Sequence, residues 1–141
     1  GGLQALEVSP DPRVTTSVSM NSGVLNTAKG APPMPVNIGK DILPKLHAPL
    51  VYIIGGEKDI AFPNASDDFR RIDHVPVAIA NLDVGHGGTY REPYGGEFAR
   101  VAVAWLKWRL KGDEESGKLW AGPSCGLCTD PRWKIEKKNL P

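Results

Sequence analysis

The middle of the chain reads Leu50-Val51-Tyr52-Ile53-Ile54-Gly55-Gly56-Glu57-Lys58-Asp59. A short, continuous apolar run that ends at glycines is typical of a strand buried on both faces of a sheet. The glycines turn the chain, and Asp59 follows at the carboxyl end of the strand. Ligands of open α/β sheets bind at that edge. The stretch therefore predicts an α/β sheet with a carboxylate, Asp59, at its binding edge.

A second apolar run, predicted as a strand over 75–82, leads into Asp83-Val84-Gly85-His86-Gly87-Gly88-Thr89. Glycines on both sides leave the histidine without steric cover, so its imidazole can reach a neighbouring group. His86 is therefore predicted to be a general base. Because Asp59 and His86 follow successive predicted strands, we expect their side chains to meet at one edge of the sheet.

Prolines and apolar periodicity predict the elements that precede the first strand. Pro10 and Pro12 end a helix, since proline removes a backbone donor. Alternation from Val14 to Met20 indicates a strand of period two. The predicted elements are a helix over 2–8, a strand over 14–20 with an exit loop over 21–23, an irregular segment over 28–36 and a short helix over 38–46.

From Gly95 onward the period changes. Apolar residues recur at i, i+3, i+4, i+7 and i+8, which predicts a long amphipathic helix that packs on the sheet and stops at Gly112. The apolar residues on this stripe are Phe98, Val101, Ala102, Trp105 and Leu106. Residues 112–141 show no repeat period and are interpreted as a C-terminal tail, pinned by Trp120, a cysteine pair and Trp133.

Three strands that alternate with helices predict an α/β fold with a mostly parallel sheet and flanking helices. Three strands are few for a sheet that is buried on both faces. We therefore expect the N-terminal half of the sheet to be absent from this chain.

Length and composition limit the classes of protein. With 141 residues, 40% apolar content and four tryptophans, the chain is predicted to form one packed domain. A net charge of +1 gives no electrostatic footprint for nucleic acid or an acidic membrane. No run approaches the roughly 18 apolar residues of a membrane span. The expected partners therefore include neither nucleic acid nor membrane.

Several segments together resemble the secreted serine esterases of the α/β-hydrolase superfamily. These segments are Gly1-Gly2-Leu3-Gln4-Ala5-Leu6, Asn21-Ser22-Gly23, Gly55-Gly56-Glu57-Lys58-Asp59-Ile60-Ala61, Gly85-His86-Gly87-Gly88-Thr89-Tyr90 and Cys125-Gly126-Leu127-Cys128. The resemblance implies that Asp59 is the acid and His86 the base of a Ser-Asp-His triad. It also implies an oxyanion hole that uses the backbone N–H of the residue after the nucleophile, and this residue is Gly1 if the nucleophile directly precedes it.

In α/β-hydrolases the chain order is nucleophile, acid, histidine. No G-x-S-x-G precedes Asp59 or His86 in the chain, and its first residues look like the helix after a nucleophile elbow. We therefore expect residues 1–141 to be the C-terminal half of a single catalytic domain, inactive alone and completed by its N-terminal half. The expected activity is hydrolysis of a small carboxylic ester. The alternatives are a non-catalytic binding or structural module, and a peptidase or acyltransferase on the same scaffold.

Other residues were weighed for the same roles. Asp83 and Asp67 are rival acids, although Asp83 is close to the histidine in sequence and Asp67 suits a helix cap. Ser22, at a predicted strand exit, is a rival nucleophile without the preceding glycine, and it is better suited to line a pocket or cap a turn. His47 and His74 have no catalytic context and are predicted to be surface or capping residues.

Cys125 and Cys128 have C-x-x-C spacing, which fits a structural disulfide, a redox pair or half a zinc site. A redox pair should open a helix after a strand, and zinc needs two further ligands that the neighbouring sequence lacks. A disulfide is therefore predicted, with no metal and no cofactor. Together with the sequon Asn64-Ala65-Ser66, the disulfide indicates a secreted protein.

Overall fold

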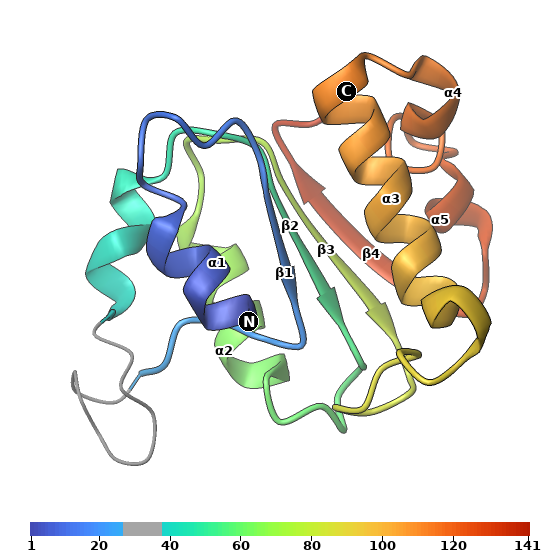
Figure 1. Ribbon diagram of the computed structural model, residues 1–141, viewed down its shortest axis with the longest axis horizontal. Coiled ribbons are helices and arrows are strands. Elements are labelled where there is room, and N and C mark those ends of the chain that lie inside the picture. The colour runs from blue at the N-terminus through green and yellow to red at the C-terminus, as the bar shows by residue number, and fades with distance from the viewer. Residues whose placement is uncertain (27–37) are drawn as a thin grey trace.

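The computed structural model describes residues 1–26 and 38–141, and the irregular segment predicted over 28–36 lies outside them. Helices cover both faces of a four-stranded sheet, so the fold is mixed α/β (Figure 1). In chain order the elements are α1 (Gly2–Val8), β1 (Ser17–Met20), η1 (Lys40–Lys45), β2 (Leu50–Ile54), α2 (Phe62–Arg71), β3 (Val77–Leu82), η2 (Pro93–Gly95), α3 (Gly96–Lys111), α4 (Glu114–Gly117), α5 (Gly126–Thr129) and β4 (Trp133–Lys138).

The sheet has the order β1-β2-β3-β4, and its first three strands are parallel. Val51 of β2 lies opposite Val18 on one side and Ala78 on the other. The mostly parallel sheet predicted from the sequence is thus confirmed. Two strands are shorter than predicted, because β1 begins at Ser17 and β3 at Val77. The helix expected over 38–46 is a 3₁₀ helix, η1, and contains Pro44.

Strand β2 lies at the centre of the fold, and all five of its residues are buried. Successive side chains of a strand point to opposite faces of the sheet. Leu50, Tyr52 and Ile54 pack in the apolar cluster that includes residues of α1, η1 and α2. Val51 and Ile53 pack in the second cluster, with α3. The continuous apolar run in the sequence therefore reflects two helical layers, one on each face (Figure 1).

Helix α3 has the amphipathic stripe that the sequence predicts, with one exchange. Its buried residues are Phe98, Val101, Ala102, Trp105 and Trp108. Leu106, predicted on this stripe, is exposed, and Trp108 is buried in its place. The helix ends at Gly112, whose left-handed φ of 66° favours glycine.

Residues 112–141 are more ordered than the predicted tail. They contain α4, α5 and β4, and β4 pairs antiparallel with β3. The sequence, which shows no repeat period here, did not predict these three elements. Strand β4 has two apolar residues, Trp133 and Ile135, and four charged ones. The alternation of apolar and charged residues is too short to identify the strand in the sequence. Charged side chains are common on edge strands, where they prevent pairing with other chains.

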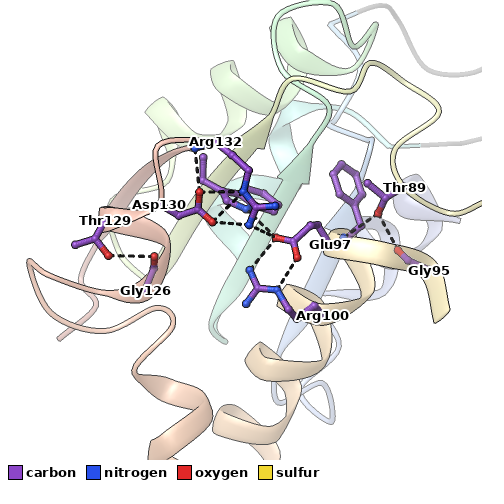
Figure 2. A network of polar contacts seen from close by, with 10 residues as sticks. Thr89, Gly95, Glu97, Arg100, Gly126, Thr129, Asp130 and Arg132 are labelled. Carbon is purple, nitrogen blue, oxygen red and sulfur yellow. Dashed lines mark hydrogen bonds and ion pairs between the residues drawn. The ribbon is translucent and has the colours of Figure 1, made fainter. Parts of the chain in front are cut away.

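Polar contacts attach the start of β4 to α3, as Figure 2 shows. Glu97 of α3 pairs with Arg100 at 2.8 Å and with Arg132 at 3.1 Å. Arg132 also binds Asp130 at 2.7 Å, and hydrogen bonds from Arg132 lower the pKa of Asp130 to about 2. The indole N–H of Trp133 donates to Glu97 at 3.3 Å. The network fixes the turn that returns the chain to the sheet.

Cys125 and Cys128 form the predicted disulfide. The Cys125 sulfur also accepts the backbone N–H of Cys128, so this residue caps α5. Trp120, five residues before the pair, and Leu127, between the two cysteines, are fully buried against α3 and the sheet. The disulfide therefore lies beside the core and closes a very short loop.

Replacing both cysteines with serine is expected to lower the free energy of unfolding by about 2 kcal/mol, the chain-entropy value for so short a loop. Serine keeps an oxygen at the cap of α5, so the change isolates the covalent link. Urea unfolding of the wild-type protein and the variant measures the difference. An unchanged midpoint would show that the link adds nothing to the cap.

Candidate active site

Asp59 and His86 meet at the carboxyl edge of the sheet, as the sequence predicts. Asp59 lies in the loop after β2, and His86 lies in the loop after β3. Because β2 and β3 are parallel neighbours, their carboxyl ends point to the same edge (Figure 1). The imidazole Nδ1 of His86 lies 2.6 Å from Oδ1 of Asp59.

The Asp59 carboxylate is surrounded by hydrogen-bond donors. Its side chain is 0% exposed. Oδ1 accepts the backbone N–H of Ala61 at 2.9 Å, and Oδ2 accepts that of Gly55 at 2.9 Å and the Asn21 amide at 2.5 Å. Burial raises the pKa of Asp59, but hydrogen bonds from Ala61, Gly55, His86 and Asn21 outweigh it and hold the pKa below its usual value. Asp59 is therefore ionised at neutral pH.

An ionised Asp59 determines the tautomer of His86. A carboxylate only accepts hydrogen bonds, so Nδ1 of His86 carries the proton and donates it. In the neutral ring, the lone pair is then on Nε2. Because the side chain is 49% exposed and lines a pocket, the ring can accept a proton from a group bound there.

This pocket has a volume of about 450 Å³. Its walls come from the start of α1, the loop after β1, the start of α2 and the histidine loop, and they combine aliphatic side chains with amides and one carboxylate. The lining residues are Gly1, Leu3, Gln4, Glu7, Asn21, Ser22, Gly23, Leu25, Ile60, Ala61, Asn64 and His86.

Two glycines bring the acid and histidine loops together. The backbone N–H of Gly85 donates to the carbonyl of Gly55 at 2.8 Å. A Cβ on Gly55 would lie 1.9 Å from the Gly85 carbonyl oxygen. No side chain fits at such a distance, so the approach of the two loops requires glycine at position 55.

A Gly55→Ala variant is expected to lose about 3 kcal/mol of stability, since the loops must separate to admit the methyl group. Displacement of Asp59 from His86 by about 1 Å is expected to lower kcat/KM about 100-fold for any reaction in which His86 transfers a proton. Gly87→Ala is the matched control, because a Cβ on Gly87 meets no atom within 4 Å. Equal losses in the two variants, by urea unfolding and by kinetics, would contradict the proposed contact.

The histidine loop is fixed at its far end by Thr89, which is buried. Its hydroxyl donates to the carbonyl of Gly95 at 2.8 Å and accepts the backbone N–H of Phe98 at 2.9 Å (Figure 2). The next residue, Tyr90, donates its hydroxyl to the side-chain oxygen of Asn21 and packs edge-on against Phe98. The loop is therefore tied both to α3 and to the end of β1.

The rival acids lie elsewhere. Asp83 is exposed and pairs with Lys58 at 3.6 Å. Asp67 lies in the middle of α2, where it pairs with Lys40 and Arg71. The capping role predicted for Asp67 was wrong, because α2 begins five residues earlier, with a proline in its first turn.

The other histidines contact backbone carbonyls. Nε2 of His47 lies 2.9 Å from the oxygen of Asp11, and Nε2 of His74 lies 2.8 Å from that of Leu46. Neither histidine lines the pocket beside His86.

Ser22 and Gly1 both line the pocket with His86. Pocket lining was the favoured interpretation of Ser22, and its hydroxyl packs where a Cβ on Gly2 would lie, 2.3 Å away. No hydrogen bond joins Ser22 to His86 among the described residues. Asn64 of the predicted sequon lies in α2, within a helix rather than a surface loop, and it also lines the pocket.

Sequence reasoning missed Asn21 and Tyr90 as members of the site. Both stand in segments that were singled out, Asn21 at a strand exit and Tyr90 after the histidine loop. An asparagine that directly follows a strand is a signal for a left-handed residue, and Asn21 has a φ of 47°. Its two partners, distant in sequence, gave no signal.

No protein-family model matches the chain, and no curated protein matches it in sequence. Among residues 1–26 and 38–141, we find no group of three or more His, Cys, Asp or Glu side chains that could hold a metal ion. Within the same ranges, every helix is too short or too polar to cross a membrane.

Proposed function

We propose that this chain supplies the acid and the base of a serine hydrolase of the α/β-hydrolase kind, acting on carboxylic esters. The observation that carries the proposal is the contact between a buried, ionised Asp59 and His86, with the ring open to a pocket. A structural histidine has no need of a buried carboxylate that itself receives three further hydrogen bonds.

In this mechanism the nucleophile's hydroxyl oxygen attacks the ester carbonyl while Nε2 of His86 takes its proton. Asp59 stabilises the imidazolium that forms. His86 then gives the proton to the departing alkoxide as the carbon–oxygen bond breaks, which leaves an acyl-enzyme. Water, deprotonated by His86 in turn, releases the acid and restores the nucleophile.

The nucleophile is proposed to be a serine directly before Gly1, with the backbone N–H of Gly1 as an oxyanion donor. Gly1 supports this assignment because it lines the same pocket as His86, and a Cβ placed on Gly1 meets no atom within 4 Å. Within the described residues, β1 pairs only with β2, so a strand that leads into Gly1 could pair along its other edge. Such a strand would belong to the N-terminal half of the same domain. A disulfide-bonded chain of this kind fits a secreted enzyme.

The pocket walls favour a small uncharged ester. Leu3, Leu25 and Ile60 offer aliphatic surface, and Gln4 and Asn64 offer amides. A peptidase or acyltransferase would use the same acid and base, so the substrate has to be assigned by assay.

A second candidate is a binding module that keeps the hydrolase scaffold without its chemistry. It is favoured by one observation: no serine or cysteine among the described residues is hydrogen-bonded to His86. The two candidates differ in whether a reactive hydroxyl lies at the pocket.

A fluorophosphonate probe, which labels activated serines, separates the candidates. We expect the full-length polypeptide to gain one adduct by intact mass, located on the residue before Gly1, and to hydrolyse short p-nitrophenyl esters faster than peptide anilides. His86→Ala should abolish labelling. An unlabelled wild-type protein without esterase activity would favour the binding module.

A further inference from the structure

Asn21 makes contacts that the triad does not require. Its side-chain amide donates to Oδ2 of Asp59 at 2.5 Å, and its side-chain oxygen accepts the hydroxyl of Tyr90. The amide orientation follows from its partners, because a carboxylate cannot donate and the tyrosine hydroxyl can. Asn21 is also 7% exposed, so it is almost fully removed from water.

The backbone of Asn21 is strained. Its φ of 47° lies in the left-handed region, which asparagine adopts more often than most residues but less readily than glycine. Its backbone N–H still donates to the carbonyl of Ile53 at 2.9 Å, so the residue ends β1 in register. Strained residues persist only where the surroundings hold them, and they cluster at functional sites. Glycine would relieve the strain, but it could not make the side-chain contacts.

These contacts close a ring of interactions. His86 binds Asp59, Asp59 binds Asn21, and Asn21 binds Tyr90, which follows His86 four residues later in the same loop. One amide thus connects the acid to the loop that carries the base. The ring of Tyr90 is held in turn by Phe98 of α3, with centroids 5.7 Å apart.

We propose that Asn21 is a positioning residue that, together with Tyr90, fixes the Asp59 carboxylate so that Oδ1 faces His86. The proposal rests on the proposed hydrolase function and adds to it. Without the Asn21 amide, Oδ2 keeps only the backbone N–H of Gly55, and Oδ1 is held only by Ala61 and His86, so the carboxylate resists rotation about its side-chain bond less strongly. Tyr90 prevents the amide from turning away.

Three variants of the full-length polypeptide test this role. Asn21→Gly removes the amide and suits the left-handed backbone. Asn21→Asp keeps the shape and places a second carboxylate against Asp59. Tyr90→Phe removes only the hydroxyl. Two matched controls are available: Asn139→Gly, at another left-handed asparagine with a φ of 55°, and Tyr94→Phe, at a fully exposed tyrosine.

For Asn21→Gly we expect kcat to fall about 10- to 100-fold with little change in KM, because a hydrogen bond to a charged group is lost. Tyr90→Phe should lose less, and the double variant should match Asn21→Gly alone, since the residues act as one unit. Asn21→Asp should also lower kcat, because a second carboxylate 2.5 Å from Oδ2 of Asp59 would repel it or share its proton. Asn139→Gly and Tyr94→Phe should leave these parameters unchanged.

A second readout does not depend on hydrolysis. The proton between His86 and Asp59 should give a downfield resonance in the ¹H NMR spectrum, which should broaden or shift in Asn21→Gly and not in Asn139→Gly. A resonance that responds in a protein without esterase activity would support the positioning role and refute the hydrolase proposal. An unchanged resonance together with kcat within about twofold of wild type would overturn the positioning role.

Discussion

Replacing Asp59 with asparagine is expected to lower kcat about 10,000-fold, the loss seen when a triad acid becomes an amide. The asparagine NH₂ would donate to Nδ1 of His86, and the imidazole proton would move to Nε2, which could then no longer accept a proton from the nucleophile. The same NH₂ would also face the backbone N–H of Ala61, which donates to Oδ1 of the carboxylate, whereas the amide oxygen would still accept from Gly55 and Asn21. Steady-state kinetics on a p-nitrophenyl ester measures the loss.

Asp83→Asn is the control for this variant. It removes an exposed carboxylate from the loop of His86, three residues before the histidine, without removing a hydrogen bond to it. Its kcat should remain within about twofold of wild type. A large loss in Asp83→Asn with a small loss in Asp59→Asn would reverse the assignment of the acid.

The stability of the Asp59→Asn variant relative to wild type is also expected to depend on pH. The folded state holds the pKa of Asp59 below its usual value of 3.8. Its ionised form therefore stabilises the fold at neutral pH, and this contribution is lost as the pH falls through the usual value to the folded one. Asp59→Asn should be less stable than wild type at pH 7, and the difference should shrink below pH 4.

Replacing Asp68 with asparagine is expected to cost about 3 kcal/mol of stability, the lower part of the range for breaking a buried ion pair. Asp68 is 0% exposed, and its carboxylate accepts Lys40 Nζ at 2.5 Å, the backbone N–H of Val24 at 2.7 Å and the hydroxyl of Tyr52 at 3.2 Å. Burial raises its pKa, despite the lowering by hydrogen bonds from Lys40, Val24 and Tyr52. Asparagine would turn a donor toward one of these donors.

Asp67→Asn is the matched control, because Asp67 adjoins Asp68 and also pairs with Lys40, at 3.3 Å, but is more exposed. It should cost less than about 1 kcal/mol. Val24 lies between Gly23 and Leu25, which line the pocket, so Asp68→Asn should also raise KM. Equal unfolding midpoints for the two variants would show that the fully buried carboxylate contributes no more stability than the partly buried one.

The sequence was most informative where one strand leads into one loop. The run from Leu50 to Asp59 predicted both a buried strand and the position of a carboxylate, because burial on two faces and a glycine turn leave local patterns. The glycines around His86 likewise predicted an imidazole at the end of the next strand. Since β2 and β3 are adjacent and parallel, two local predictions were enough to predict a long-range contact.

The parts that could not be predicted depend on partners distant in sequence. Nothing near Asn21 indicates that Tyr90 and Asp59 share its amide. The pairing of Asp68 with Lys40 arises only once α2 and η1 pack together. The apolar pattern of β4 is too short to identify it as a strand in the sequence. The strand pairs with β3 because the turn after α5 returns the chain to the sheet.

The contact between Gly55 and Gly85 bears on how the specificity of this protein could change. Because the two backbones touch, a side chain at Gly55 would separate Asp59 from His86, whereas a Cβ on Gly85 meets no atom within 4 Å and glycine is favoured there by a left-handed φ of 73°. Variation that preserves the chemistry is then confined to pocket walls carried by other segments, such as Leu3, Leu25 and Ile60. If the proposed hydrolysis is found, a library for directed evolution should hold both glycines constant and randomise those three positions, which leaves the contact between Asp59 and His86 in place.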